Sequence, residues 1–362
     1  MTPEANDQPE PQKPARRRRY RGTHPRQFAQ RYKELDPAAY PEMAGHIQAQ
    51  GRTPAGSHVP IMVAEVLAAL NPQPGEVAAD VTLGHGGHAR ELLRRVGPAG
   101  VLVGLDVDAA ELERTRGLLE QEFPGPRIKL ARKNFAGLKK VLAAEGLRAD
   151  VVLADLGVSS MQLDDPQRGF SYKQDGPLDL QMDQRRPETA ADLLGRIAEA
   201  KLGQALRELA DEPDHAAIAR AIVQAREAGP LTRTRQLVEI VLRAKGISPQ
   251  SLRQRRQRGE SALHPAARTF QVLRILVNDE LTALATLLRD APALLAPAGR
   301  IGVITFHSGE DRLVKASFLE FFRQGIYQVI SPEPMRPTPG EIHANPRSRG
   351  AKFRWAKLSA DL

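Results

Sequence analysis

The chain has 362 residues, of which 41% are hydrophobic and 26% charged, an ordinary composition for a globular protein with a full α/β core and one more small domain. It contains no cysteine, which excludes a disulfide framework and a thiolate metal site, and no apolar run reaches the roughly 18 residues of a membrane span. The acidic, proline-rich start does not have the pattern of a secretory signal, so we expect a cytoplasmic protein.

The net charge of +9 is concentrated near the N-terminus. Residues 13–33 contain nine Lys or Arg and no acid, and the rest of the chain holds equal numbers of basic and acidic residues. We interpret residues 1–57 as a basic, partly disordered extension that binds nucleic-acid phosphates. A solubilising tail is the alternative.

From residue 58 onward, short apolar strands alternate with amphipathic helices, which predicts a parallel sheet with helices on both faces. The expected strands lie near residues 77–82, 101–105, 127–131, 150–154 and 300–306.

The alternation stops between the fourth and fifth strands, where residues 188–245 have helical periodicity. We therefore expect an α/β domain, residues 58–160 and 263–362, interrupted by a helical subdomain at 161–262. A second basic cluster, 253–258, ends the insertion, and one long helix over 266–289 is predicted to lead back to the sheet.

A glycine-rich turn, Gly84-His85-Gly86-Gly87, follows the first strand, and the second strand ends at Asp106, 20 residues after Gly86. Glycines let the backbone approach a ligand closely, and an acid at this offset is typical of a carboxylate that binds a ribose. The pattern predicts an adenosine-type cofactor. Taken alone, it fits a nicotinamide enzyme equally well.

The fourth strand ends at Asp155, with Ser159 in the following loop. In a doubly wound sheet these residues face the same crevice as Gly86 and Asp106. The exocyclic amine of a nucleobase is a poor nucleophile, because its lone pair is conjugated with the ring. Acceptors such as Asp155 would hold its N–H bonds and receive the released proton. The alternative is that Asp155 only caps its loop.

Five separated blocks resemble the bacterial 16S ribosomal RNA cytosine-N4 methyltransferases (the RsmH or MraW family). They are GHGGH at 84–88, DLGVSSMQLDDPQRGFSY at 155–172, DGPLDLQMD at 175–183, HPAARTFQVLRILVNDEL at 264–281 and ITFHSGEDRLVK at 304–315; NPRSR at 345–349 also fits. The resemblance implies a class I S-adenosylmethionine-dependent methyltransferase fold, a Rossmann-like doubly wound α/β sheet with an inserted helical subdomain.

The resemblance also implies S-adenosylmethionine as the cofactor and assigns its contacts. The residues matched to the family's cofactor set are Gly86, Gly87 and His88, along the methionine and ribose side, Asp106 at the ribose hydroxyls, Phe135 at the adenine, Asp155 and Gln162. Two of these have structural alternatives, since His88 at a helix start can be a cap and Phe135 an ordinary core residue.

We predict Asp155, Ser159 and His307 as catalytic residues, although His307 can instead satisfy loop amides. Asp164 and Asp165 are adjacent, so we expect a solvated turn and no metal pair. Two arginines, Arg268 and Arg274, lie near one face of the predicted long helix, where they contact either RNA phosphates or acids of the insertion.

The expected reaction is methylation of the N4 amine of a cytidine in the decoding centre of 16S rRNA, in the small ribosomal subunit, with no metal and no membrane. A homodimer stays open, because members of the family can pair. The alternatives are another RNA cytidine or a DNA cytosine, a ribosome-assembly factor that binds RNA without turnover, and, more distantly, a nicotinamide dehydrogenase.

Overall fold

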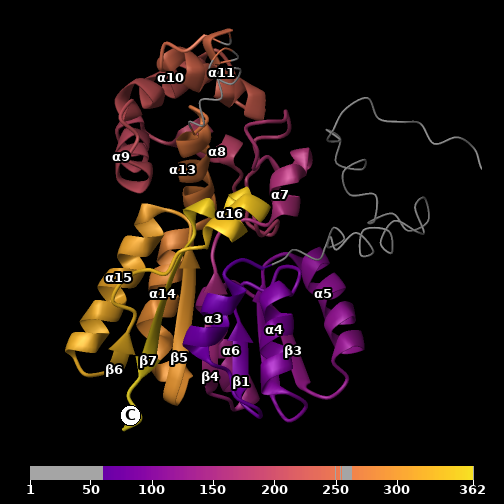
Figure 1. Ribbon diagram of the computed structural model, residues 1–362. Coiled ribbons are helices and arrows are strands. Elements are labelled where there is room, and N and C mark those ends of the chain that lie inside the picture. Colours follow the sequence, from indigo (N-terminus) through magenta and orange to yellow (C-terminus); the bar gives the residue numbers. More distant parts are fainter. Residues whose placement is uncertain (1–59, 249, 253, 255–262, 362) are drawn as a thin grey trace, which may run out of the picture. The chain divides into compact units, whose positions relative to one another are not determined.

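The computed structural model describes residues 60–248, 250–252, 254 and 263–361 (Figure 1). The predicted extension at 1–57 and nearly all of the basic cluster at 253–258 lie outside the described residues. The described chain has a sheet flanked by helices, and a group of helices gathers beyond one end of the strands (Figure 1).

Seven strands of the described chain form one sheet in the order β3-β2-β1-β4-β5-β7-β6. Their bounds are β1 Val77–Asp80, β2 Val101–Asp106, β3 Arg127–Arg132, β4 Ala149–Asp155, β5 Leu295–Thr305, β6 Tyr327–Ile330 and β7 Lys352–Leu358. The first five are parallel, and β7 runs antiparallel between β5 and β6. This order confirms the predicted α/β fold of a class I methyltransferase.

The register of the central strands explains why both faces of the sheet are covered. Ala78 pairs with Leu102 and Val151, and all three belong to one apolar cluster; the next residue, Ala79, belongs to the other. Successive strand residues point to opposite faces, so a run that is apolar throughout needs helices on both sides. Helices α3 (Val63–Leu70), α4 (Gly87–Val96) and α5 (Ala109–Glu122) cover one face, whereas α6 (Leu138–Glu145), α14 (Glu280–Leu294) and α15 (Ser308–Arg323) cover the other.

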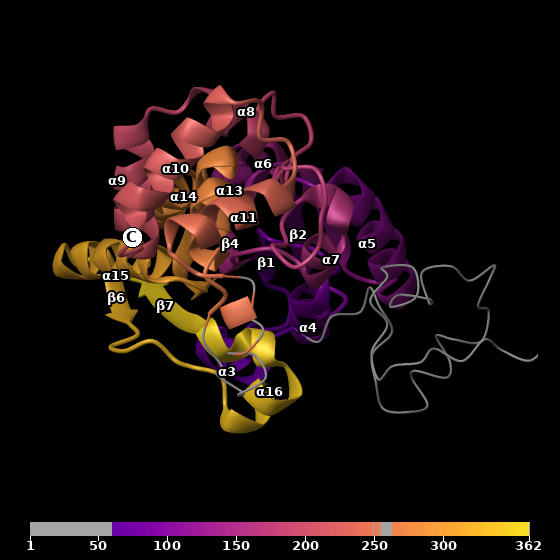
Figure 2. The same cartoon turned by 90° about the horizontal axis from the view of Figure 1, so that it is seen from above.

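A third apolar cluster lies among the helices between β4 and β5, where the insertion was predicted. The described helical segments between β4 and α14 are the short α7 (Ser160–Asp164) and η3 (Pro166–Arg168), then α8 (Ala190–Arg196), α9 (Glu199–Ala210), α10 (His215–Glu227), α11 (Thr234–Ala244) and α13 (Ala267–Asn278). Seen from above, most of these helices gather over the sheet (Figure 2). The division of the chain at residues 161 and 262 stays a prediction.

The prediction of one long helix over 266–289 is wrong. Helix α13 ends at Asn278, Asp279 adopts the left-handed conformation with φ 53°, and α14 begins at Glu280. Aspartate tolerates this conformation better than most residues. The Asn278 amide donates to the carbonyl of Leu180, 2.7 Å away, so a tertiary contact holds the break in place.

The strand predictions were right in number for the parallel part and inexact at their ends. The first strand stops at Asp80, two residues early, and β5 begins at Leu295, before the predicted residue 300. Strands β6 and β7 were not predicted. Three short segments complete the described chain, η2 (Phe135–Gly137), α16 (Pro339–Ala344) and η4 (Pro346–Gly350).

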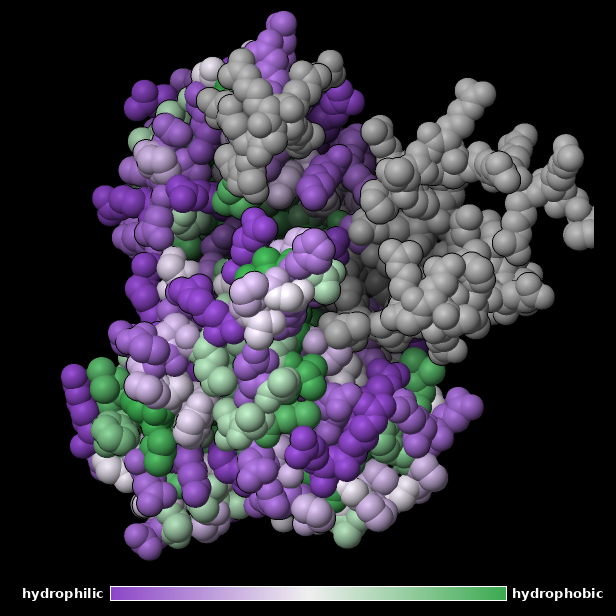
Figure 3. Space-filling model, viewed as in Figure 1, coloured by the Kyte–Doolittle hydropathy of each residue, from purple (hydrophilic) through white to green (hydrophobic). Residues whose placement is uncertain are grey.

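Two large apolar side chains are exposed near the edge strand β6. Phe322 at the end of α15 is 45% exposed and Val329 on β6 is 40% exposed. Apolar residues gather at this lower left corner of the surface (Figure 3). Across the described ranges, no helix combines the length and apolar character that crossing a membrane requires.

A candidate cofactor pocket and active site

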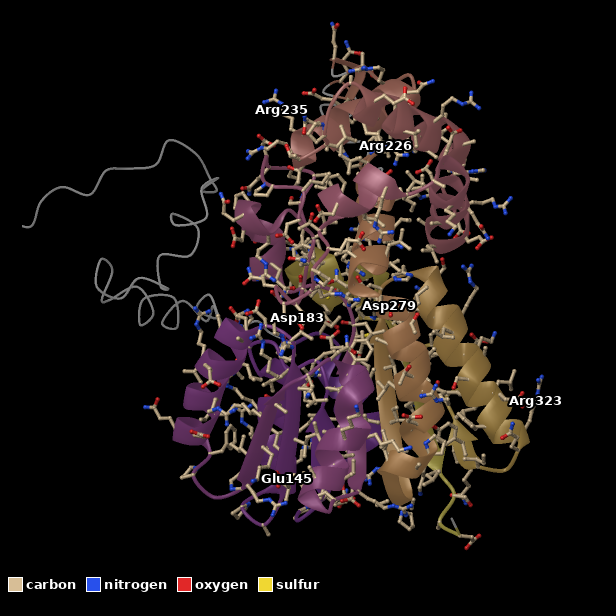
Figure 4. All side chains as sticks on the ribbon, turned by 180° about the vertical axis from the view of Figure 1, so that it is seen from behind. Glu145, Asp183, Arg226, Arg235, Asp279 and Arg323 are labelled. Atoms are coloured by element: carbon tan, nitrogen blue, oxygen red, sulfur yellow. The ribbon has the colours of Figure 1, made fainter. Side chains whose placement is uncertain are left out.

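A cavity of about 520 Å³ opens at the carboxyl edge of the parallel strands. Asp80, Asp106 and Asp155, the last residues of β1, β2 and β4, line it, and Asp183 and Arg274 line it from the helical side. Figure 4 labels Asp183, which lies between the sheet and the group of helices. The volume is in the range of small-molecule sites, which in such sheets lie at this edge.

The glycine turn brings backbone to the wall of this cavity. Gly84 and Gly86 have φ of 47° and 71°, a region that disfavours other residues. A Cβ at Gly86 would lie 2.8 Å from Cγ2 of Thr115, and the Thr115 hydroxyl donates to the carbonyl of Gly84 at 2.7 Å. Both the backbone conformation and the contact with α5 therefore require glycine at position 86.

Asp106 closes the same turn from the second strand. One carboxylate oxygen accepts the N–H of Gly84 at 2.7 Å, and the other accepts the N–H of Asp108 at 2.9 Å. Burial raises the pKa of Asp106, although the two amides lower it. The residue thus fixes the glycine turn and still lines the cavity, where its predicted ribose contact stays a prediction.

Three charged side chains meet at the floor of the cavity. Nε2 of His88 lies 3.5 Å from Oδ2 of Asp155, and both side chains line the cavity together with Asp80. Burial alone would lower the pKa of His88, but the carboxylates of Asp155 and Asp80 outweigh it and raise that pKa. Burial raises the pKa of Asp80 to about 6, against the attraction of His88.

Ser159 and Gln162 cap each other at the start of α7. The N–H of Ser159 donates to the Gln162 side chain, and the N–H of Gln162 donates to the Ser159 hydroxyl, both at 3.1 Å. Phe135 stands at the start of η2. The structure brings most of the predicted residues to one cavity, namely Gly87, His88, Asp106, Phe135, Asp155, Ser159 and Gln162.

Two predicted residues do not line that cavity. Gly86 lies behind the wall, where it shapes the turn. His307 lines a smaller neighbouring cavity, and its Nδ1 accepts the N–H of Glu310 at 3.3 Å as the cap of α15. The cap is the alternative role that the sequence left open for His307.

Both arginines of α13 contact protein groups. Arg274 pairs with Glu280 through Nε and Nη2, each at 2.8 Å, and Arg268 donates to the carbonyl of Asp211 at 2.6 Å. The solvated turn expected at Asp164 was wrong, since this side chain is buried and lies 3.1 Å from the guanidinium of Arg347, in the NPRSR segment. Long-range pairing across the cavity edge buries it.

Sequence reasoning missed several residues that line the cavity. Asp80 was overlooked although an acid that ends an otherwise apolar strand is itself a signal. Arg186, Asn278, Glu280 and Arg347 also line it. They come from the insertion, the helix break and the C-terminal segment, so only the tertiary fold could place them here.

Comparison with known proteins identifies the family to which this chain belongs. The model of the MraW methylase family matches residues 55–359. The chain belongs to the MraW methylase family. It is 44% identical over 347 residues to Ribosomal RNA small subunit methyltransferase H 2 of Alkaliphilus metalliredigens, which covers 95% of this chain and 98% of the relative.

Other relatives have similar names. Ribosomal RNA small subunit methyltransferase H 1 of Lachnoclostridium phytofermentans is 42% identical, with 94% of this chain and 92% of the relative covered. Ribosomal RNA small subunit methyltransferase H of Geobacter sulfurreducens is also 42% identical, with 83% of this chain and 98% of the relative covered.

As a MraW methylase, the chain uses S-adenosylmethionine, and the cavity fits this cofactor. Its cradle has glycine backbone at the start of α4, a carboxylate at Asp106 and an aromatic ring at Phe135. Nε2 of His88 and Oδ1 of Asp155 are buried, and within the described residues neither atom makes a hydrogen bond. Buried polar atoms are normally satisfied, so Oδ1 of Asp155 has capacity for a bound polar group, whereas Nε2 of His88 already faces Oδ2 of Asp155 at 3.5 Å.

Proposed function

We propose that this MraW methylase transfers the methyl group of S-adenosylmethionine to the N4 amine of a cytidine in the decoding centre of 16S rRNA. The names of its relatives support a small-subunit rRNA substrate. The observation that carries the chemistry is Asp155, whose buried Oδ1 has no hydrogen bond within the described residues and which lines the same cavity as the glycine turn. The basic segment 13–33 would add contacts to RNA phosphates.

When bound, the cofactor supplies an electrophilic methyl group on a sulfonium, the cytidine supplies the N4 amine, and the protein must make that amine a competent nucleophile. The carboxylate of Asp155 accepts an N–H of the amine, which weakens the conjugation of the lone pair and gives the released proton an acceptor. Ser159 offers a second acceptor in the same loop. Holding the amine in line with the methyl group provides much of the remaining acceleration.

His88 has an electrostatic role in this proposal. Its raised pKa keeps the imidazole more protonated near neutral pH than an ordinary histidine, and the positive charge stabilises the carboxylate of Asp155, 3.5 Å away. The cation also opposes the accumulation of negative charge from Asp80 and Asp155 at the floor of the cavity.

The test is nucleotide-by-nucleotide mass spectrometry of 16S rRNA from cells that lack the gene. We expect one N4-methyl mark on a decoding-centre cytidine to disappear and the wild-type gene to restore it. An unchanged methylation map would overturn the proposed substrate.

The role of Asp155 is tested with the purified protein. The Asp155→Asn variant is expected to lose about 10²- to 10⁴-fold in the rate of methyl transfer to small subunits, the range for an acid–base group. Asp165→Asn is the matched control, because Asp165 caps η3 and does not line the cavity. Full activity of Asp155→Asn, at unchanged affinity for S-adenosylhomocysteine, would remove Asp155 from the mechanism.

A further inference from the structure

A second, smaller cavity adjoins the cofactor cavity on its helical side. Its volume is about 160 Å³, close to that of five water molecules at roughly 30 Å³ each. Four aromatic rings, from Phe170, Tyr172, Phe270 and Phe306, contribute to its walls. A small cavity with aromatic walls suits a flat, stacked ring.

The two cavities share part of their walls. Val158, Leu163, Arg274 and Phe306 line both of them. Val158 follows the strand-end residue Asp155 by three positions, in the loop that the proposed function places beside the reacting amine. A ring in the second cavity would therefore lie next to the space in which the methyl group is transferred.

Arg274 is the cationic side chain common to both cavities. Its Nε and Nη2 donate to the two oxygens of Glu280, each at 2.8 Å, and the side chain is only 14% exposed. This two-point contact fixes the plane of the guanidinium. Within the described residues Nη1 makes no hydrogen bond, so the guanidinium of this residue, which lines both cavities, keeps a free donor.

A second carboxylate holds the aromatic wall to the same cluster. Oε2 of Glu310 accepts the N–H of Phe306 at 2.8 Å, and Oε1 lies 4.0 Å from Nη2 of Arg274. A Cβ at Gly157 would lie 3.4 Å from the Phe306 ring, which packs against the loop after Asp155. Guanidinium, ring and loop are therefore fixed relative to one another before any substrate arrives.

We propose that the second cavity binds the base of the target nucleotide and that Arg274 selects cytosine by donating to its O2 and N3 edge. Cytosine presents two acceptors there, beside the N4 amine, whereas uracil presents a donor at N3 and adenine has no O2. Enzymes that modify a base read its flipped pairing edge with hydrogen bonds and stack its faces. This inference rests on the proposed function, which places the N4 amine beside Asp155.

The test combines protein variants with altered target bases. Arg274→Gln alone would leave the Glu280 carboxylate buried without its partner, so the charge-balanced variant R274Q/E280Q is used. Arg268→Gln is the matched control, since Arg268 lies on the same helix and lines neither cavity. Substrates are small subunits whose target position carries cytidine, 3-deazacytidine, which lacks the N3 acceptor, or 2-thiocytidine, which has a weaker acceptor at position 2.

We expect the wild-type protein to lose about 10- to 100-fold in single-turnover methyl transfer on at least one analogue, the range of a good base-edge contact. R274Q/E280Q should methylate cytidine about 10- to 100-fold more slowly than the wild-type protein does. Its rates on cytidine and on that analogue should differ by less than about threefold, because the variant lacks the side chain whose contact the analogue removes. Arg268→Gln should behave like the wild-type protein.

Three outcomes would overturn the inference. In the first, the wild-type protein methylates both analogues as fast as cytidine; in the second, R274Q/E280Q still methylates the analogue about 10- to 100-fold more slowly than cytidine. In the third, that variant loses affinity for S-adenosylhomocysteine as much as it loses rate, which would mean that Arg274 holds the cofactor. Failure of the proposed function looks different, because the wild-type protein would then leave the unmodified cytidine subunit without a methyl group.

Discussion

The two sides of the cavity are built in different ways. On the sheet side, the glycine turn presents backbone groups, held by Asp106 and Thr115 from the next strand and helix. On the helical side, Arg274, Glu280 and Glu310 form a buried cluster of charged side chains from three helices. The first side depends on the absence of side chains, and the second depends on charges that balance.

This difference predicts different responses to mutation. A turn made of glycine backbone is disturbed by an added carbon atom, because its close contacts are steric. A buried ionic cluster tolerates replacement of the whole set by neutral groups, yet loses stability when one partner is removed and the other charge stays buried. The variants below separate these two behaviours.

The largest effect is expected for Glu280→Ala. Glu280 is 9% exposed and is the two-point partner of Arg274, so its removal leaves a buried guanidinium with only the more distant Glu310. We expect a loss of about 3–5 kcal/mol in the free energy of unfolding, measured by denaturant titration.

The matched control for this variant is Glu145→Ala. Glu145 pairs with Lys129 at 3.2 Å but is 30% exposed, and it lies at the far end of the sheet from Asp183 (Figure 4). We expect at most about 1 kcal/mol there. Equal losses of unfolding free energy for the two variants would show that burial of the Arg274 cluster does not raise the energy of its ion pair. The proposed difference between the helical side and the glycine turn would then be wrong.

The second prediction concerns Asp80, a buried carboxylate at the end of β1 on the sheet side. Its folded pKa of about 6 lies above its ordinary value of 3.8, so the folded state holds the proton more tightly. Stability from this group is therefore fully present below pH 3.8 and is lost as the pH rises toward 6, by up to about 3 kcal/mol.

Asp80→Asn removes this titration and keeps the acceptor for the N–H of Thr82. The variant should be more stable than the wild-type protein at pH 8 and close to it at pH 4, as measured by thermal unfolding at both pH values. A variant that is less stable at pH 8 would mean that Asp80 contributes more through the charge of His88 than it costs through its own burial.

The sheet side was predictable from sequence because its contacts are local. The glycine turn, His88 and Asp106 lie within 23 residues of one another, and strand spacing alone places the turn beside the acid. The parallel strands were predictable for the same reason, since each is a short apolar run between helical segments. Strand β7, KFRWAKL, could have been found from the alternation of its last four residues, in which Ala356 and Leu358 are buried and Trp355 and Lys357 are only partly buried.

The helical side was not predictable, because its residues meet only in the folded chain. The break at Asp279 has neither glycine nor proline to signal it, and without the break Arg274 cannot pair with Glu280 as the structure shows. Asp164 and Arg347 are 183 residues apart and pair across the cavity edge. The sequence suggested phosphate contacts or salt bridges for Arg274 but could not name the partner.

The smallest difference is expected on the sheet side, between Gly86→Ala and a matched control. The left-handed conformation at φ 71° costs a non-glycine residue about 1–2 kcal/mol, and the added Cβ meets Cγ2 of Thr115 at 2.8 Å. Gly146→Ala is the matched control, because Gly146 has φ 65° and a Cβ there meets no atom within 4 Å. The difference in unfolding free energy between the variants isolates the steric part, for which we expect about 1–2 kcal/mol.

The same pair of variants also measures what the turn does for the cofactor. Relief of the contact at Gly86 must displace Thr115, whose hydroxyl is bonded to the carbonyl of Gly84, and so must move the wall of the cavity. We expect weaker binding of S-adenosylhomocysteine by Gly86→Ala, and unchanged binding by Gly146→Ala, in isothermal titration. If both variants bind equally well, the close packing of the turn on α5 serves only stability. The difference between the glycine backbone on one side of the cavity and the ionic cluster on the other would then affect folding stability and not cofactor binding.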